Sequence, residues 1–209
     1  MSLAGATSAP PWLDVSRETI ANLERMLQEV LRWNSAINLI SPGTKDTAWT
    51  RHVLDSAQLV DFVVGRSGHW VDLGSGGGFP GLVLAVIAKE TAPNLRFTLV
   101  ESDQRKATFL QQTARTLAVD VSVVAERAER LGPLEADVIS ARALRVLADL
   151  LPYAHRHLRP SGIALFLKGV SFQQEVTVAR QEWSFDAECL PSRTNPSAGL
   201  VVVRNIAHV

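Results

Sequence analysis

The sequence predicts an α/β protein with a doubly wound, mostly parallel sheet, an antiparallel hairpin at one sheet edge and a helical extension ahead of the sheet. Short β-branched runs alternate with helical segments from residue 69 onward, which is typical of parallel strands joined by right-handed crossovers. A glycine-rich turn follows the first of these runs. The 209 residues, 46% of them hydrophobic, suffice for one catalytic unit with a sizeable core.

Two helices are expected before the sheet, within residues 1–68. Ser16 can cap a helix whose apolar positions, among them Leu23, Leu27 and Val30, follow the 3.6-residue period. After a break at residues 41–43, a second helical stretch is predicted from about residue 47 to 64. We expect this N-terminal extension to pack on the domain formed by residues 69–209.

The remaining elements follow in alternation. The strands are expected at Trp70–Leu73, Arg96–Glu101, Val121–Ala125, Asp137–Ala141 and Ile163–Leu167, and the helices at about 80–90, 103–118, 143–157 and 172–182. Two further runs, Trp183–Leu190 and Leu200–Arg204, are separated by prolines and lie close together in the sequence. They predict an antiparallel pair at the sheet edge.

Composition excludes several classes of protein. Lys plus Arg and Asp plus Glu both number 21, so nucleic acid or a membrane surface could be bound only by local patches. Cys189 is the only cysteine, which excludes an internal disulfide, and no Cys/His cluster offers metal ligands. The longest apolar run, Leu82–Ala88, is too short for a bilayer, and Met1–Pro11 lacks the pattern of a signal peptide. We expect a cytoplasmic, unexported protein with a frayed start.

The glycine-rich turn, Gly74 to Gly81, is the main functional signal. It follows the first strand, at the carboxyl edge where doubly wound sheets bind ligands, and glycines let backbone amides approach a ligand closely. A dinucleotide fingerprint begun at Gly74 requires glycine at position 79, where this chain has Phe79. The spacing found, Asp72 followed by Gly74, Gly76 and Gly78, is that of class I methyltransferases and predicts S-adenosylmethionine as cofactor.

Polar residues at the next strand ends complete the expected cofactor site. Glu101 closes the second strand, where a carboxylate can accept hydrogen bonds from both ribose hydroxyls. Ala128 and Glu129 follow the third strand, near the expected adenine, and Arg142 closes the fourth. For Glu101 and Glu129 a solvated carboxylate, and for Arg142 a structural ion pair, are the alternatives.

The absence of two motifs narrows the range of possible methyl acceptors. The fourth strand ends in Ser140–Ala143 rather than in the Asn/Asp-Pro-Pro-aromatic tetrad of amino-group methyltransferases. Cys189 lies too late in the chain to be the nucleophile of a C5-pyrimidine enzyme. With these acceptors excluded, the sequence favours a ring nitrogen with a free lone pair as the methyl acceptor. Such a nitrogen needs no general base but only in-line positioning.

Basic residues on the same sheet edge suggest contacts with RNA. Arg105 and Lys106 begin the helix after the second strand, and Lys168 follows the fifth; a solvated helix face is the alternative for the first two. We expect Arg142 or Lys168 to position the substrate through guanine O6 or a phosphate, because a bidentate contact to O6 and N7 would block N7. Arg51 and His52 lie on one helix just before the sheet and are further candidates for RNA binding or for closing over the cofactor. An i,i+4 ion pair of Arg51 with Asp55, with His52 packed beside it, is the alternative.

The chain resembles the bacterial 16S rRNA guanine-N7 methyltransferase family, RsmG, also called glucose-inhibited division protein B, over nearly its whole length after about residue 16. Beyond the loop, the likeness rests on matching residues in order: Trp33, Asn34, Asn38, Leu39, Arg51, His52, Leu54, Asp55, Ser56, Glu101, Lys106, Arg127, Glu129, Arg142, Ala143, Lys168 and Gly169. The resemblance implies cofactor binding by Gly74, Phe79, Ala128, Glu129 and Arg142, with Asp72 and Glu101 in supporting positions. It implies as substrate a guanine in the 530 loop of 16S rRNA, guanine 527, in naked RNA or in the small subunit, and we expect a monomer.

Two other functions remain open from the sequence. The same architecture could host an NAD-dependent oxidoreductase, although Phe79 argues against it. An RNA-binding ribosome-assembly factor without turnover could retain a degenerate cofactor site. Binding of NADH would identify the first, and absence of methyl transfer to 16S rRNA the second.

Overall fold

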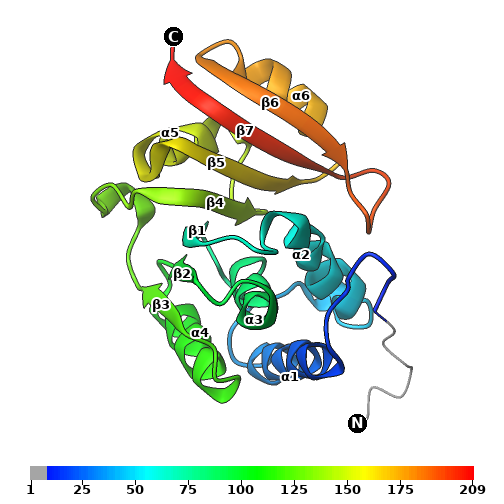
Figure 1. Ribbon diagram of the computed structural model, residues 1–209. Helices are drawn as coiled ribbons and strands as arrows, with labels where there is room; N and C mark the ends of the chain where they lie inside the picture. Colours follow the sequence, from blue (N-terminus) through cyan, green and yellow to red (C-terminus); the bar gives the residue numbers. More distant parts are fainter. Residues whose placement is uncertain (1–8) are drawn as a thin grey trace.

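The computed structural model describes residues 9–209, and most of the expected frayed start lies outside these residues. The described chain forms a seven-stranded sheet with helices on both faces (Figure 1). The strands are β1 Gly68–Leu73, β2 Leu95–Val100, β3 Val121–Val124, β4 Ala136–Arg142, β5 Leu158–Lys168, β6 Trp183–Pro191 and β7 Gly199–His208. The α-helices are α1 Arg17–Trp33, α2 Asp55–Ala57, α3 Gly81–Thr91, α4 Gln104–Thr116, α5 Leu147–His157 and α6 Phe172–Ala179.

The strand order β3-β2-β1-β4-β5-β7-β6 places the first strand in the middle of the sheet. Strands β1 to β5 pair in parallel, and β7 pairs antiparallel with both β5 and β6. The chain winds from β1 outward to β3 and then returns to β4 on the other side of β1. The loops after β1 and β4 therefore diverge, and this switch point is where doubly wound sheets bind ligands. The predicted fold class, with its antiparallel edge pair, is confirmed.

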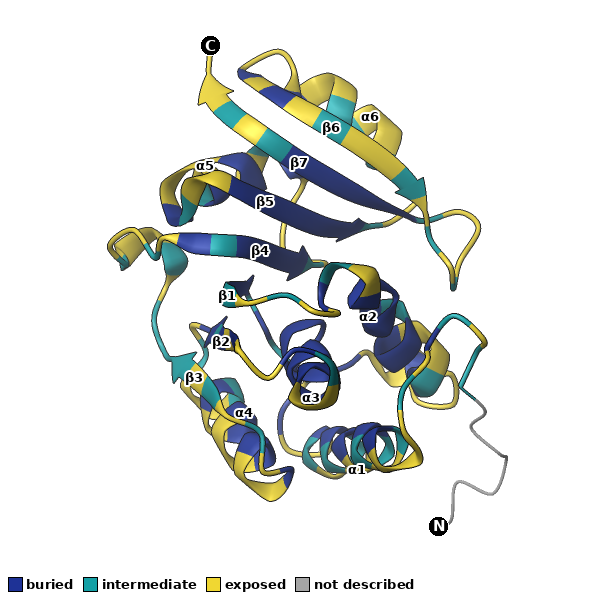
Figure 2. Cartoon of the chain, viewed as in Figure 1, coloured by how far each residue is buried: buried dark blue, intermediate teal, exposed yellow. Residues whose placement is uncertain are grey.

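Helix α3 explains why the sheet needs the N-terminal helix. Residues 81–88 are apolar around the whole helix and all are buried, so both its sides require cover. Helix α1 supplies it with its buried face (Figure 2). Leu23, Met26 and Leu27 of α1 belong to the same core as α3. Ser16 caps α1 as predicted, and Glu90 of α3 accepts a hydrogen bond from the Thr19 hydroxyl at 2.5 Å.

The opposite face of the sheet is covered by α5 and α6. Buried residues of β4, β5 and β7, such as Ile139, Phe166 and Val201, pack there against Leu150 and Ala154 of α5. Strands β5 and β7 are buried along much of their length, whereas α4 exposes its outer side (Figure 2). This sandwich fixes the carboxyl ends of the central strands in place.

The second N-terminal helix differs from the prediction. The stretch expected from 47 to 64 is a π-helix at Trp49–Leu54, a single α-turn at Asp55–Ala57 and a 3₁₀ helix at Gln58–Phe62. Side chains donate hydrogen bonds to three carbonyl groups of this stretch. Arg142 donates to the Arg51 carbonyl at 3.1 Å, Ser56 to that of His52 at 2.7 Å and Gln58 to that of Asp55 at 2.7 Å. This competition with the helical hydrogen bonds accounts for the irregular turns.

Among the described residues, none of the helices has both the length and the apolar character needed to cross a membrane.

Candidate active site

The glycine-rich loop turns tightly beyond β1. Gly74, Gly76 and Gly78 have φ angles of +67°, +53° and +89°, a region that residues with a side chain rarely adopt. The amides of Gly74 and Ser75 donate to Val100 at the end of β2, at 2.9 and 3.1 Å. The loop therefore rests on the neighbouring strand and keeps backbone close to the crevice.

Asp72 holds this loop from below. One carboxylate oxygen accepts from the Gly81 amide at 3.1 Å, and the other from the Ser140 hydroxyl at 2.6 Å. The Ser140 oxygen in turn accepts from the Trp70 indole at 2.8 Å. These hydrogen bonds thereby connect β1, β4 and the start of α3. Complete burial raises the pKa of Asp72 to about 6. Sequence reasoning missed Ser140 and Trp70; the alternation of Trp70 and Asp72 on one face of a strand was the available signal.

Glu101 lies where the sequence places it, beside the loop. Its Oε2 accepts from the Gly76 amide and its Oε1 from the Asp103 amide, both at 2.8 Å. The residue is buried. Each carboxylate oxygen has a second acceptor position, so Glu101 can also accept hydroxyl groups of a ligand at the loop.

A pocket of about 90 Å³ opens beyond the ends of the central strands. It brings together three predicted cofactor residues, Gly74, Ala128 and Glu129. The rest of the lining is Leu73, Val100, Ser102, Glu126, Arg127, Leu144, Arg145 and Tyr153. We call it the cofactor pocket.

A second, larger cleft of about 330 Å³ lies on the other side of the β4 end, and we call it the acceptor cleft. Four predicted residues, Arg51, His52, Arg142 and Lys168, line it. The remaining lining residues are Ser41, Thr44, Asp55, Ala143, Leu167, Gly169, Ser192, Thr194, Asn195, Ala198 and Gly199. The loop between β6 and β7 thus forms a wall that sequence reasoning did not assign to the site.

Arg142 is the centre of the acceptor cleft. Its guanidinium lies 5.1 Å from the centroid of the Phe79 ring, and Phe79 is buried. Nη1 lies 3.6 Å from Asp55 Oδ2, and Nη2 donates to His52 Nδ1 at 3.0 Å. Burial lowers the pKa of Arg142, an effect that the charge of Asp55 opposes. Arg142 Nε is buried and has no hydrogen-bond partner among residues 9–209.

His52 is held as a neutral ring. Burial first, and then the charges of Arg142 and Arg51, lower its pKa to about 4. Because Nδ1 accepts from Arg142, the proton lies on Nε2, which donates to Thr44 Oγ1 at 3.0 Å. The ring also packs against Phe79, with 5.2 Å between the centroids.

Lys168 lines the acceptor cleft but bonds other groups of the protein, whereas Arg105 and Lys106 lie outside both sites. The Lys168 ammonium contacts the Arg145 carbonyl and Glu175 Oε2, both at 2.6 Å, and its side chain is only 7% exposed. Arg105 and Lys106 begin α4, with their amides capped by Asp103. They line neither the cofactor pocket nor the acceptor cleft.

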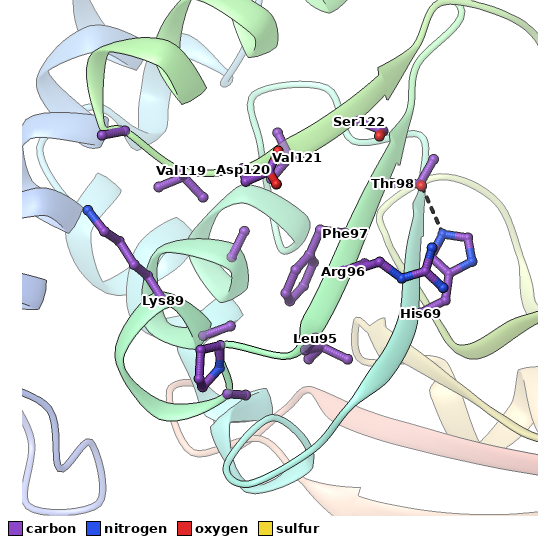
Figure 3. A pocket seen from close by; sticks show the side chains of 15 residues that line it. His69, Lys89, Leu95, Arg96, Phe97, Thr98, Val119, Asp120, Val121 and Ser122 are labelled. Carbon is purple, nitrogen blue, oxygen red and sulfur yellow. Dashed lines mark hydrogen bonds between the residues drawn. The ribbon is translucent and has the colours of Figure 1, made fainter.

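Another cleft of about 330 Å³ lies at the amino ends of β1, β2 and β3 (Figure 3). His69, Lys89, Arg96 and Asp120 line it, and the His69 ring hydrogen-bonds Thr98 at 2.8 Å. The glycine loop is at the opposite ends of these parallel strands. This cleft is therefore separate from the candidate active site. In the described part of the chain, no group of three or more His, Cys, Asp or Glu residues could hold a metal ion.

The strand order, the glycine loop after β1 and the acidic residue after β2 define a class I, S-adenosylmethionine-dependent methyltransferase. Solved structures agree in fold. A SAM-dependent methyltransferase from Aquifex aeolicus superposes with a TM-score of 0.58 at 10% identity, over 85% of this chain and 96% of the other. A ribosomal protein L11 methylase from Lactobacillus delbrueckii gives a TM-score of 0.56 at 19% identity, over 74% and 79% of the two chains.

Sequence comparisons identify the family within this class. The family model of rRNA small subunit methyltransferase G matches residues 19–197. A relative of that name from Cereibacter sphaeroides is 53% identical over 94% of this chain and 95% of its own length, and one from Ruegeria pomeroyi is 45% identical over 94% and 96%. The chain belongs to the rRNA small subunit methyltransferase G family. This confirms the resemblance inferred from the sequence and excludes the oxidoreductase alternative.

Proposed function

We propose that this protein transfers a methyl group from S-adenosylmethionine to N7 of a guanine in 16S rRNA, namely guanine 527 of the 530 loop. The observation that carries the proposal is the meeting of two sites at the end of β4. Arg142 and Ala143 line the acceptor cleft, and the next two residues, Leu144 and Arg145, line the cofactor pocket. A methyl donor and its acceptor can therefore approach each other across four consecutive residues.

The residues around the loop fit the cofactor. The backbone of Gly74, Gly76 and Gly78 approaches the ligand, and Glu101 accepts the ribose hydroxyls. Ala128 and Glu129, which line the cofactor pocket, would contact the adenine. S-adenosylmethionine, when bound, supplies a methyl group bonded to a positively charged sulfur and therefore open to attack by a nitrogen lone pair.

Asp72 and Phe79 act indirectly in this proposal. Asp72 uses both carboxylate oxygens within the protein, so it fixes the loop on which the cofactor lies. Phe79 supports the Arg142 guanidinium from one face. Arg142 Nε, a donor left without a protein partner in residues 9–209, would bond an acceptor oxygen of the cofactor or of the base.

At the acceptor cleft the protein has to position the base and does not have to transfer a proton. Guanine N7 carries a lone pair and no proton, so the new N–C bond forms without a base, while the electrons of the broken bond return to sulfur. His52 suits this reaction, because its ring is neutral and its Nδ1 is occupied by Arg142. The base must leave its stack before it enters the cleft.

Contacts with RNA are divided among the basic residues. Arg51 and His52 at the acceptor cleft, and the more distant Arg105 and Lys106, would contact the RNA backbone and add a salt-dependent affinity. Lys168 would act mainly through the loop that it holds. The protein would work as a cytoplasmic monomer on 16S rRNA or on the small subunit.

Transfer of labelled methyl groups tests the proposal. Purified protein is incubated with labelled S-adenosylmethionine and with 16S rRNA or small subunits from cells that lack the enzyme, and the modified base is mapped. We expect label in 7-methylguanine at guanine 527. Label in another base, or in another atom of guanine, would refute the assignment, and binding of 16S rRNA without transfer would favour an assembly factor.

A further inference from the structure

The loop between β4 and α5, residues 143–146, covers part of the cofactor pocket, and we call it the strap. All four of its residues are exposed, yet Leu144 lies directly against the glycine loop. A Cβ atom added to Gly74 would be 2.6 Å from Leu144 Cδ1. The pocket below measures about 90 Å³, whereas ligand pockets commonly reach about 300–1,000 Å³. The strap therefore takes up space that a cofactor needs.

Two side chains from outside the strap hold its backbone. Lys168, the last residue of β5, donates to the Arg145 carbonyl at 2.6 Å. Glu175 of α6 accepts from the Leu147 amide at 2.8 Å through Oε2, and the same oxygen lies 2.6 Å from the Lys168 ammonium. Ser171 donates to the other Glu175 oxygen at 3.0 Å.

This pair is shielded from water. The side chains of Lys168 and Glu175 are 7% and 15% exposed, so their charge-assisted hydrogen bonds are stronger than those of a surface ion pair. They bond the backbone on both sides of Val146, at the Arg145 carbonyl and the Leu147 amide, while Val146 itself is exposed. At the other end of the strap Ala143 has a φ of +51°, a conformation that a non-glycine residue keeps only when its surroundings impose it.

We propose that Lys168 and Glu175 are positioning residues for the cofactor. Together they clamp the strap so that Leu144 and Arg145 form a wall of the cofactor pocket, and release of the clamp admits and discharges the cofactor. The proposal rests on the proposed function, since it takes the pocket to be the S-adenosylmethionine site. It gives α6, which lines neither pocket through its own residues, a role in the cofactor site.

Trypsin provides a readout that does not depend on methyl transfer. The bond after Arg145 lies in the strap, and its carbonyl is the group that Lys168 holds. Cleavage there requires the strap to open. Loss of hydrogen bonds to a charged group changes such an equilibrium by about tenfold or more. In Glu175→Gln we therefore expect cleavage after Arg145 to be about tenfold faster, and dissociation of S-adenosylhomocysteine in stopped-flow experiments to be faster by a similar factor.

Two further variants make the test specific. Glu182→Gln changes an exposed carboxylate just after α6 and should leave both rates unchanged. Ser171→Ala removes one hydrogen bond from Glu175 and keeps both charges, so we expect an increase of about two- to fivefold in both rates. If Glu175→Gln failed to fold, Ser171→Ala would decide the question through the same two rates.

The outcomes separate the two proposals. Cleavage after Arg145 at the wild-type rate in Glu175→Gln and Ser171→Ala would overturn the clamp. Faster cleavage with unchanged dissociation of S-adenosylhomocysteine would overturn the role of the strap in admitting the cofactor. Failure of the wild-type protein to bind S-adenosylhomocysteine would refute the proposed function and this cofactor role with it, while the cleavage rates would still decide whether the clamp exists.

Discussion

Two glycines of one loop should respond differently to the same added methyl group. At Gly81 a Cβ atom would lie 2.5 Å from Leu99 Cδ2 and 2.6 Å from Asp72 Cβ. Leu99 and Asp72 are fully buried, so Gly81→Ala must push α3 away from the sheet. Overpacking of this kind costs about 1–3 kcal/mol, and weakening of the hydrogen bond from the Gly81 amide to Asp72 adds about 1 kcal/mol.

Gly76→Ala is the matched control. There the nearest atom to an added Cβ is the Gly74 carbonyl oxygen, at 3.8 Å, and only the φ of +53° opposes a side chain. This conformation costs a non-glycine residue about 1 kcal/mol.

Urea denaturation monitored by circular dichroism measures both losses. We expect the free energy of unfolding to fall by about 2–4 kcal/mol in Gly81→Ala and by about 1 kcal/mol in Gly76→Ala. For a chain of this length the first value corresponds to a fall of roughly 5 to 15 °C in the melting temperature. Equal losses in the two variants, or a Gly81→Ala protein as stable as wild type, would refute the packing argument.

Three further predictions concern charge. Because the pKa of His52 is lowered to about 4, the free energy of unfolding should fall as the pH falls from about 6.5 to 4. Because the pKa of Asp72 is raised to about 6, the free energy of unfolding should fall by about 3 kcal/mol as the pH rises from about 4 to 6. The two effects oppose each other, so urea denaturation of Asp72→Asn from pH 4 to 7 should show a steeper rise of stability with pH than wild type; an unchanged slope would contradict the shift of Asp72. Glu101→Gln should raise the dissociation constant for S-adenosylhomocysteine about tenfold or more in calorimetry, and an unchanged constant would remove Glu101 from the site. Asp55→Asn leaves the largely buried Arg142 without its counter-charge, and we expect a loss of about 2 kcal/mol in the free energy of unfolding; a loss below about 0.5 kcal/mol would show that the ion pair contributes little.

Local patterns in the sequence predict much of this fold. Alternating β-branched and helical segments predict the central strands to within a few residues, and the caps and periodicity of α1 predict its start at Ser16. The glycine loop is predictable because its φ angles admit few other residues. The resemblance to a family supplied the rest of the expected site.

What the sequence did not predict depends on contacts between distant segments. The helix expected from 47 to 64 is irregular because Arg142, some ninety residues later, takes the Arg51 carbonyl. The hydrogen bonds from Trp70 through Ser140 to Asp72 join two strands that become neighbours only in the sheet. No spacing in the sequence indicates such pairs.

Lys168 shows the same limit for a charged residue. Its position after β5 suggested a contact with RNA, yet its ammonium lies between Glu175 of α6 and the carbonyl of Arg145. A basic residue at a strand end can serve the ligand or the loop that shapes the ligand site; Lys168 also lines the acceptor cleft, so its contact with the substrate stays a prediction.

The central claim is that the glycine loop and Glu101 form an S-adenosylmethionine site. Isothermal titration calorimetry of the purified protein, first with S-adenosylhomocysteine and then with NADH, tests it most directly. We predict binding of one S-adenosylhomocysteine per chain and no heat of binding with NADH. Binding of NADH, or the absence of binding of S-adenosylhomocysteine by the folded protein, would contradict the account.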